Sequence, residues 1–572
     1  MSKLHDLGKI DQPLLHDYSG LRNYQNAVAA ALADLRDNAI MARIWKHDHT
    51  VWKPDPTEIT NRLGWLHSPQ VMLEAIPEIT ALVDAVRAEG YMHALLLGMG
   101  GSSLAPEVFR FTFGVKSGYL DLAVLDSTDA DAVQAHAKRL DPAKTLFLVS
   151  TKSGGTVETF SFFKYFYNLT AAKIGQEKTG AHFIAITDPG SGLAETAKKY
   201  NFRKTFLNDP NIGGRYSALS YFGLVPAALI GVDLKMLLEG AQQMAEDSKS
   251  GDNSSSHLGA IMGELAVAGR DKVTLIASPP IQYFGAWAEQ LIAESTGKEG
   301  KGILPVDGEE IGAPNIYAND RLFAYLRLAG DATYDAKVEA LRQAGHPVVQ
   351  LNLHDVHDIG GEFFRWEIAT IIASRRLQIN PFDQPDVESA KVLARQMVAA
   401  YQQEGKLPES TPSLQVKGVS VYSNLVAKNL NEALTKFLAQ AQSGRSYVAL
   451  QAYVQPTPET EAALKNLRTK IQTRLRVATT VGYGPRFLHS TGQLHKGDAG
   501  NGLFIQFTAD PMQDAPIPDE AGASKSSMTF GVLKLAQALG DRQALLEAKR
   551  RVIRFHFAKD IVGELQNFAK MI

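Results

Sequence analysis

From about residue 92 the sequence alternates short apolar runs with segments long enough for crossover helices, and this pattern leaves few possible folds. The first four runs are residues 94–97, 122–125, 145–150 and 183–187. Three more runs, after a polar stretch, are residues 273–277, 322–328 and 348–353. Strands that are apolar throughout are buried on both faces, as in a parallel sheet between two layers of helices. We therefore predict an α/β protein with two doubly wound parallel-sheet units in tandem.

Two polar segments predict the domain boundaries. Residues 246–256 are rich in Ser, Asp, Asn and Lys, and residues 404–417 carry two prolines. Further strand and helix patterns follow the second segment. The expected parts are an N-terminal helical segment (1–66), a first domain (67–245), a second domain (256–403) and a C-terminal α/β lobe (418–572). That lobe is either a third domain or an extension of the second sheet.

The net charge and the cysteine count of the chain exclude several classes of function. The chain has 572 residues, a net charge of −2 and no cysteine. Near-neutral charge without a basic run gives no argument for nucleic-acid binding. The absence of cysteine excludes disulfides, thiolate zinc sites and a cysteine nucleophile. The first residues lack the apolar core of a signal peptide, so we expect a cytoplasmic protein.

A glycine-rich turn follows the first apolar run. Gly98, Gly100, Gly101, Ser102 and Ser103 lie between that run and a helical segment from residue 107. A dinucleotide-binding fingerprint needs a third glycine at position 103, and no Gly-Lys-Ser/Thr of a phosphate-binding P-loop is present. Glycines let the backbone approach a ligand, and a helix start presents free N–H groups to an anion. A sugar-phosphate cradle and a tight structural turn are equally compatible with this stretch.

A second loop of this kind follows the third apolar run. Hydroxyls at Thr151, Ser153 and Thr156 surround Gly154 and Gly155 at a helix start. One hydroxyl would suffice to cap a helix, whereas three can donate to phosphate oxygens. Three hydroxyls beside another glycine–hydroxyl loop favour an anion site over capping.

Four further residues have the chemistry of catalytic groups. Arg215 follows two glycines and can stabilise negative charge, although a surface ion pair would also explain it. Glu294 ends an apolar helical stretch, where partial desolvation would suit a general base, and Gln290 lies one turn earlier. An exposed helix-end glutamate explains Glu294 equally well. Lys391 lies near the start of a predicted helix, where the helix dipole disfavours a cation. A lysine at such a position suggests a positive charge that binds a ligand.

Two histidines, His489 and His495, lie in a glycine-rich segment after a predicted strand. Either can move a proton near neutral pH. A second pair, His354 and His357, precedes two glycines and is interpreted as a loop, with a metal role much the less favoured.

Together these motifs resemble the phosphoglucose isomerases, which are built from two sugar-isomerase (SIS) domains. Residues 151–156 are similar to that family's phosphate loop, 213–217 to its Gly-Gly-Arg-Tyr/Phe-Ser motif and 294–298 to its Glu-Ser-Asn-Gly-Lys motif. Residues 380–391 resemble its Asn-x-Phe-Asp-Gln to lysine stretch. A closer resemblance, over nearly the whole chain, is to the isomerase half of bifunctional transaldolase/phosphoglucose isomerase proteins.

The resemblance implies roles for these residues. The phosphate would be held by Gly101, Ser102, Thr151, Ser153 and Thr156. Glu294 would shuttle a proton between C1 and C2 through a cis-enediol intermediate. Arg215 would stabilise that intermediate, with Glu158 as its ion-pair anchor. Gln290 would hold a sugar hydroxyl, and Lys391 would assist ring opening. The family needs no metal and no organic cofactor, because a placed carboxylate can deprotonate a carbon beside a carbonyl.

One departure from the family concerns the ring-opening histidine. The family has it between the catalytic glutamate and the lysine, but no good match lies between Glu294 and Lys391. We predict His489 for this role, with His495 second, so the element would have moved behind the lysine in chain order. The family's histidine comes from a neighbouring subunit, which implies a homodimer.

The predicted activity is interconversion of glucose 6-phosphate and fructose 6-phosphate. An isomerase for mannose 6-phosphate or a sulfonated sugar phosphate is an alternative, and so is a non-catalytic sugar-phosphate sensor. The chain has no room for a transaldolase barrel, so we expect a stand-alone isomerase or one whose transaldolase partner is a separate chain. No nucleic-acid or membrane partner is expected.

Overall fold

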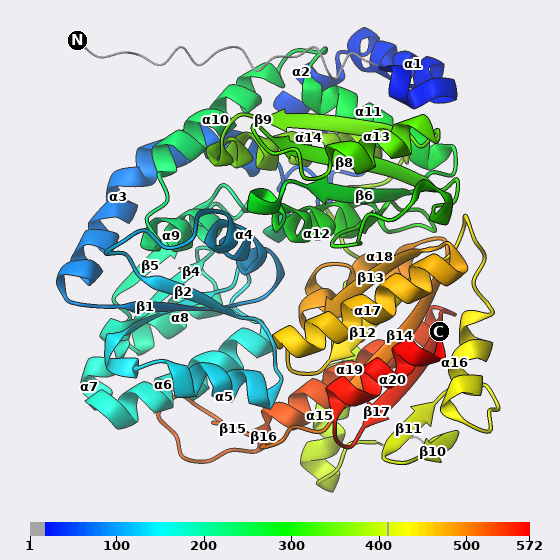
Figure 1. The fold of residues 1–572 in the computed structure, drawn as a ribbon. Coiled ribbons are helices and arrows are strands. Elements are labelled where there is room, and N and C mark those ends of the chain that lie inside the picture. The colour runs from blue at the N-terminus through cyan, green and yellow to red at the C-terminus, as the bar shows by residue number, and fades with distance from the viewer. Residues whose placement is uncertain (1–17, 409–410) are drawn as a thin grey trace.

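The computed structural model describes residues 18–408 and 411–572, and it contains three main sheets (Figure 1). We call the parts built on them the first, second and third lobes, in chain order. The first lobe has five parallel strands in the order β2-β1-β3-β4-β5. They are β1 (His93–Gly98), β2 (Asp121–Leu125), β3 (Thr145–Ser150), β4 (Phe183–Thr187) and β5 (Lys204–Leu207).

Helices cover both faces of this sheet, as its apolar strands require. In β1, Leu96 belongs to the core shared with α3 (Ser68–Ala88), α4 (Leu104–Phe113) and α9 (Tyr221–Leu229). Leu95 and Leu97 point to the other face and join a core formed with α5, α6 and α8. These three helices are α5 (Ala130–Arg139), α6 (Val157–Ile174) and α8 (Gly192–Lys199). Because successive strand residues face opposite sides, both faces bury apolar side chains.

The second lobe has four parallel strands in the order β7-β6-β8-β9. They are β6 (Lys272–Ala277), β7 (Leu304–Val306), β8 (Arg321–Leu328) and β9 (Val348–Leu353). Its helices are α11 (Ser254–Val267), α12 (Phe284–Thr296), α13 (Asp335–Gln343) and α14 (Ile359–Arg376), and α10 (Leu234–Asp247) of the preceding connection packs on α14. One continuous apolar core joins this lobe to the first.

The third lobe has a six-stranded mixed sheet in the order β10-β11-β17-β14-β12-β13. Its strands are β10 (Leu414–Val416), β11 (Val419–Tyr422), β12 (Tyr447–Tyr453), β13 (Ala478–Tyr483), β14 (Gly502–Ala509) and β17 (Arg551–Phe557). The last four are mutually parallel, and β11 pairs antiparallel with β10 and β17. Among the described residues, none of these strands pairs with the sheet of the second lobe.

The helices of the third lobe are α16 (Leu430–Leu438), α17 (Pro458–Leu475), α18 (Gly492–Gly497), α19 (Phe530–Glu547) and α20 (Ile561–Met571). Helix α15 (Val387–Glu404) leads into the lobe and packs along α19. A two-stranded ribbon, β15 (Pro516–Ile517) with β16 (Met528–Thr529), precedes α19. The N-terminal helices α1 (Gln25–Asp37) and α2 (Ile40–Trp45) lie on the second lobe, with α1 against α11 (Figure 1).

The predicted α/β class with tandem parallel sheets is confirmed. Strands β3, β4 and β9 have the predicted bounds, whereas β5, β7 and β17 were not predicted. Strand β5 is a half-exposed edge, β7 has three residues including Pro305, and β17 intersperses arginines among its apolar residues. Within the predicted N-terminal helical segment, the described residues begin with a 3-10 turn (Tyr18–Tyr24), which is followed by α1 and α2.

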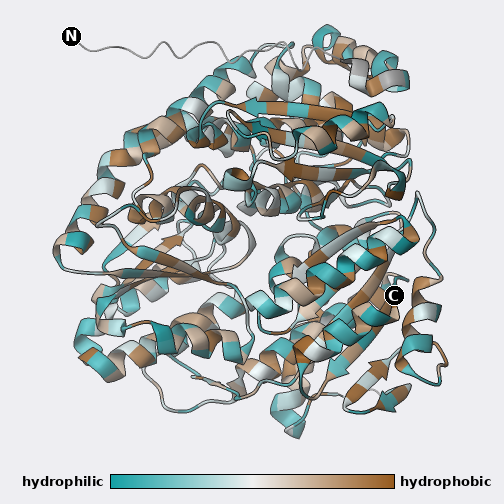
Figure 2. Ribbon diagram, viewed as in Figure 1, coloured by the Kyte–Doolittle hydropathy of each residue, from teal (hydrophilic) through white to brown (hydrophobic). Residues whose placement is uncertain are grey.

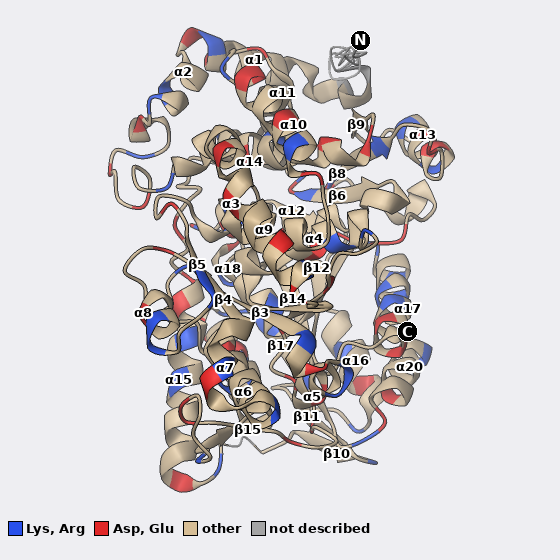
Figure 3. Cartoon of the chain, turned by 90° about the vertical axis from the view of Figure 1, so that its left-hand side faces the viewer, with Lys and Arg blue, Asp and Glu red and all other residues tan. Residues whose placement is uncertain are grey.

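Hydropathy and charge follow this layering. Hydrophobic residues run along the strands, while the outer face of α17 is largely hydrophilic (Figure 2). Lys, Arg, Asp and Glu are interspersed on the face drawn in Figure 3, in keeping with a net charge of −2. In the part of the chain that is described, no helix has the length and apolar character needed to span a bilayer.

Buried polar contacts fix the third lobe on the first. Lys534 of α19 donates to Asp129, 2.8 Å away, and both side chains are 3% exposed. Gln537, one turn later, bonds Thr128 at 2.8 Å. Both partners precede α5, just beyond the carboxyl end of β2.

We predict that Lys534→Met lowers the free energy of unfolding by about 3–5 kcal/mol, because it leaves the Asp129 carboxylate buried without its cation. Urea denaturation followed by circular dichroism measures the change. Lys525→Met is the control, since Lys525 is 85% exposed and 3.7 Å from Asp519. Equal effects of the two substitutions would show that the buried pair does not stabilise the docking of the lobes.

Candidate active site

The glycine turn after β1 is the place where three of the predicted motifs meet. Gly100 has φ +53°, and a Cβ there would lie 2.7 Å from the carbonyl oxygen of His489. A Cβ on Gly101 would lie 2.0 Å from the carbonyl oxygen of Gly214. Only glycine permits these approaches, so the turn brings the Gly-Gly-Arg segment and the His489 segment together.

The second predicted anion loop lies beside this turn. Strands β1 and β3 pair so that Gly98 is opposite Ser150, and both loops therefore leave the same sheet edge. Thr156 is the N-cap of α6, but its side chain makes no capping bond; its hydroxyl lies 2.9 Å from that of Thr151. Ser153 is exposed, and Ser102 is 9% exposed. These hydroxyls and the uncapped helix start suit an anion better than a purely structural cap.

Glu294 and Gln290 lie one helical turn apart on α12, and both are buried. The Gln290 amide donates to the Glu294 carboxylate at 3.1 Å and to the His489 carbonyl at 2.8 Å. Its own oxygen is buried and has no partner among the described residues, so it can accept from a hydroxyl of a ligand. The Arg215 guanidinium lies 3.7 Å from the other Glu294 oxygen.

Arg215 is 3% exposed and is held by the loop that precedes α15. It donates to Gln384 at 2.7 Å and to the carbonyl of Pro381 at 2.6 Å. It also donates to the hydroxyl of Ser295 at 2.9 Å. The guanidinium is therefore fixed beside Glu294.

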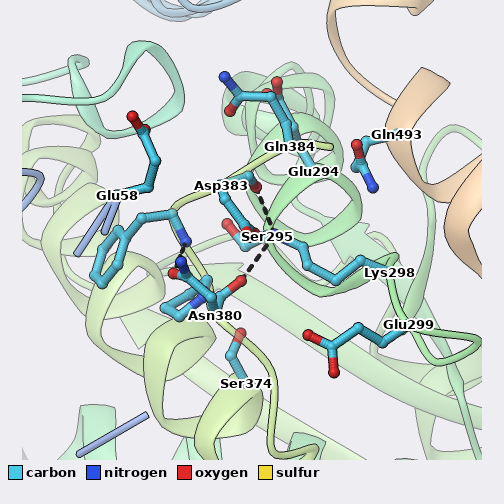
Figure 4. A network of polar contacts seen from close by, with 12 residues as sticks. Glu58, Glu294, Ser295, Lys298, Glu299, Ser374, Asn380, Asp383, Gln384 and Gln493 are labelled. Carbon is cyan, nitrogen blue, oxygen red and sulfur yellow. Dashed lines mark hydrogen bonds and ion pairs between the residues drawn. The ribbon is translucent and has the colours of Figure 1, made fainter. Parts of the chain in front are cut away.

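Lys298, the last residue of the predicted Glu294–Lys298 motif, holds the same loop (Figure 4). Its ammonium donates to the Asn380 carbonyl at 2.8 Å and to the Asp383 carboxylate at 2.8 Å. Burial and the charge of Arg215 lower the pKa of Lys298 to about 8. Two buried cations thus share the backbone carbonyls of one short loop, and neither faces bulk water.

The expected ion pair between Glu158 and Arg215 is wrong. Glu158, at the start of α6, instead bonds the His489 imidazole at 2.9 Å and Gln537 at 2.7 Å. Burial raises the pKa of Glu158, but the charge and hydrogen bond of His489 and the charge of Lys391 outweigh it, and the net pKa lies below its usual value. Arg215 has partners of its own, so Glu158 is left to pair with the histidine.

The two candidate histidines lie in different environments. His489 ends a 3-10 turn (Arg486–His489) and is half-buried at the site. His495 is 2% exposed inside the third lobe, between Phe504 and Phe487, and burial lowers its pKa well below the usual value. A neutral buried imidazole away from the other groups is a poor candidate for ring opening. Lys391 is exposed on α15, and its charge is one of those that lower the pKa of Glu158.

Sequence reasoning missed two glutamines that organise the site. Gln537 was missed because nothing near it in sequence resembles a motif; only the packing of α19 brings it to Glu158. Gln493 lies in the segment that contains both histidines, four residues after His489, and that spacing was the available signal. In the ranges 18–408 and 411–572, no group of three or more His, Asp or Glu side chains is placed to hold a metal ion.

Comparisons with known proteins identify a family to which this chain is similar. The family model of phosphoglucose isomerase matches residues 83–305, which include the phosphate loops, Arg215, Gln290 and Glu294. A glucose-6-phosphate isomerase of Rubrobacter xylanophilus is 28% identical over 379 residues, covering 57% of this chain and 87% of the relative. One from Carboxydothermus hydrogenoformans is 33% identical over 263 residues, 44% of this chain and 55% of the relative.

Solved structures show the same fold. A hypothetical protein of Thermus thermophilus superposes with a TM-score of 0.57 at 25% identity, covering 66% of this chain and 98% of that structure. A glucose-6-phosphate isomerase of Chlamydia trachomatis gives 0.57 at 18% identity, with 66% and 86% covered. The predicted resemblance to phosphoglucose isomerases is thus confirmed. Lys391 and His489 lie outside the matched residues 83–305, and their roles stay predictions.

We predict that Gly101→Ala lowers the free energy of unfolding by about 1–3 kcal/mol, because its Cβ would meet the rigid backbone of Gly214. Gly214→Ala is the matched control from the other side of the contact. Its Cβ would meet nothing within 4 Å, so a change within about 0.5 kcal/mol is expected. Urea titration compares the two; similar losses would mean that the turn does not depend on this approach.

Proposed function

We propose that this chain is a glucose-6-phosphate isomerase that interconverts glucose 6-phosphate and fructose 6-phosphate. The observation that carries the assignment is the position of Gln290, whose amide bonds both the Glu294 carboxylate and the His489 backbone. Gln290 thus lies between Glu294, the proposed base for the open-chain sugar, and the segment of His489, the proposed acid for ring opening. The family match and the relatives named as this enzyme favour it over the mannose 6-phosphate, sulfonated-sugar and sensor alternatives.

The residues suit a proton-transfer mechanism. We assign phosphate binding to Gly101, Ser102, Thr151, Ser153 and Thr156, which leave the same sheet edge. The phosphate would then fix the sugar so that C1 and C2 lie near the Glu294 carboxylate. Binding through a group remote from the reacting carbons supplies orientation, which lowers the barrier for the chemical step.

Ring opening comes first for the cyclic sugar. His489, oriented by Glu158, donates a proton to the ring oxygen as the bond between C1 and that oxygen breaks. The anomeric hydroxyl gives up its proton to solvent, and Lys391 assists at the open side of the site. A carboxylate that accepts from one imidazole nitrogen fixes the ring orientation and leaves the other nitrogen to act on the substrate.

Isomerisation then uses Glu294 as the base that removes the proton from one carbon and returns it to its neighbour. The cis-enediol intermediate forms as its enediolate, with negative charge on oxygen. Arg215, held rigidly beside Glu294, stabilises that charge without reorganising during the reaction. Gln290 accepts from a sugar hydroxyl through its unpartnered oxygen.

The partners and the compartment are proposals of the same kind. We propose a cytoplasmic enzyme, and we keep a homodimer and a separate transaldolase chain as predicted partners. The reason to expect a homodimer is a histidine supplied by a second subunit. Here His489 reaches Glu158 within one chain. We infer that a dimer, where it forms, is not needed to complete the site.

The first test is a coupled assay on Glu294→Gln. Wild-type protein receives fructose 6-phosphate, and glucose 6-phosphate is read by an NADP-linked dehydrogenase. We expect kcat to fall by about 10²–10⁴-fold in the variant, because it loses its general base while the fold is kept. Turnover that survives in Glu294→Gln would identify another base, and wild-type protein without turnover would overturn the assignment.

A second test asks whether His489 acts and from which chain. His489→Ala is expected to lose about 10²–10⁴-fold in turnover of cyclic substrate, whereas His354→Ala, in an exposed loop, is the control and keeps full activity. Co-expressing the Glu294→Gln and His489→Ala chains then distinguishes the two arrangements. A site completed within one chain gives no recovery, whereas a site shared between subunits recovers activity from mixed dimers.

A further inference from the structure

We propose that Gln493 is a positioning residue that fixes Glu294, Lys391 and His489 relative to one another. The inference rests on the proposed isomerase function and names a residue that this function does not otherwise require. None of the described hydrogen bonds of Gln493 reaches any of the three side chains. Gln493 joins instead the three backbone segments that carry them.

Every hydrogen-bonding group of the Gln493 amide is used between elements. Its nitrogen donates to the Gly297 carbonyl at 2.9 Å and to the Asp386 carboxylate at 2.6 Å. Its oxygen accepts from the backbone N–H of Asp386 at 2.9 Å. The side chain is fully buried, at 0% exposure, so water does not compete for these bonds. Figure 4 shows it beside Glu294 at the edge of the polar network.

Each bonded segment carries one of the three groups. Gly297 follows the end of α12, three residues after Glu294. Asp386 is the N-cap residue of α15, five residues before Lys391. Gln493 itself lies on α18, four residues after His489. One amide therefore links the second lobe, the connecting helix and the third lobe.

Two glycines allow the backbones to come this close. A Cβ on Gly297 would lie 2.3 Å from the Cα of Leu494. A Cβ on Gly497 would lie 2.4 Å from the Gly297 carbonyl oxygen and 2.6 Å from the Asp386 carboxylate. The Gly300 N–H also donates to the Gly497 carbonyl at 2.9 Å. We call the meeting point of residues 297–300, Asp386 and residues 493–497 the crossing. Its close backbone contacts are ones that only glycine permits, and Gln493 lies at its centre.

The phosphate loops make none of the described hydrogen bonds of Gln493. They lie on the first lobe. A displaced Gln493 should therefore reduce the rate of chemistry while anion binding is retained. A misplacement of about 1 Å is enough to cost on the order of 100-fold in rate.

The decisive variants are Gln493→Glu, Asp386→Asn and their combination. Gln493→Glu places a second carboxylate against Asp386, and we expect kcat to fall about 10–100-fold while inhibition by inorganic phosphate changes less than about twofold. In the double variant the amide introduced at position 386 can donate to the new carboxylate, and we expect kcat to recover at least about threefold. A merely structural role predicts neither the separation of kcat from phosphate inhibition nor the recovery.

The control is Gln506→Glu, another glutamine at 0% exposure in the third lobe, whose amide bonds only the Ala538 carbonyl among the described contacts. Both variants are compared per folded molecule, with folding followed by circular dichroism. Equal kcat for the two variants, or no recovery in the double variant, would overturn the positioning role. Wild-type protein without turnover would instead reject the proposed function, so the two failures are distinguishable.

A glycine pair tests the same crossing without adding a charge. Gly497→Ala is expected to lower kcat at least about tenfold, because its Cβ meets Gly297 and Asp386. Gly492→Ala, on the same short helix, would meet the Phe487 carbonyl at 3.4 Å and the Lys496 ammonium at 3.8 Å, which are ordinary van der Waals distances, and should keep at least half of kcat. Matched activities of the two alanine variants would contradict the proposal even where Gln493→Glu fails to fold.

Discussion

The contact between the buried Glu158 and the half-buried His489 is the interaction on which the site depends. Glu158 is a carboxylate inside the protein, where ionisation is costly unless a partner compensates. His489 supplies that compensation at 2.9 Å and Gln537 adds a second bond. Both partners come from the third lobe, and Glu158 comes from the first. The same ion pair therefore holds the two lobes together and orients the histidine of the site.

Around this contact the site is built mainly from backbone approaches. Gly100 and Gly101 admit the carbonyls of His489 and Gly214, and Gly297 admits α18. A Cβ at these positions would lie 2.0–2.7 Å from the neighbouring backbone, so the segments would have to move apart. Catalysis by orientation tolerates little such error, which explains why the motifs combine glycine with polar residues.

The sequence allowed much of this to be predicted, for physical reasons that can be stated. Strands such as β3 and β4 are buried throughout, and these two follow each other in the chain and also pair in the sheet. The short edge strand β7 carries too little pattern to be recognised. Glu294 and Gln290 were predicted together because one helical turn separates them.

The partners of Glu158 were mispredicted because ion pairs between distant segments leave no periodic signal. Arg215 is closer in sequence, but backbone carbonyls of residues 381–383 take its donors. His489 lies 331 residues from Glu158. Only the docking of a whole lobe brings the two together, and no local rule of sequence contains that information.

The intramolecular origin of His489 has a consequence for how the site assembles. A group supplied by a second subunit is in place only when the protein concentration exceeds the dissociation constant of the dimer. A group on the same chain is present at an effective concentration set by the fold, independent of how dilute the protein is. Completing this site is thus a first-order step, part of the folding of each molecule. The third lobe is covalently attached to the rest of the site, so His489 is in place without the association of a second molecule.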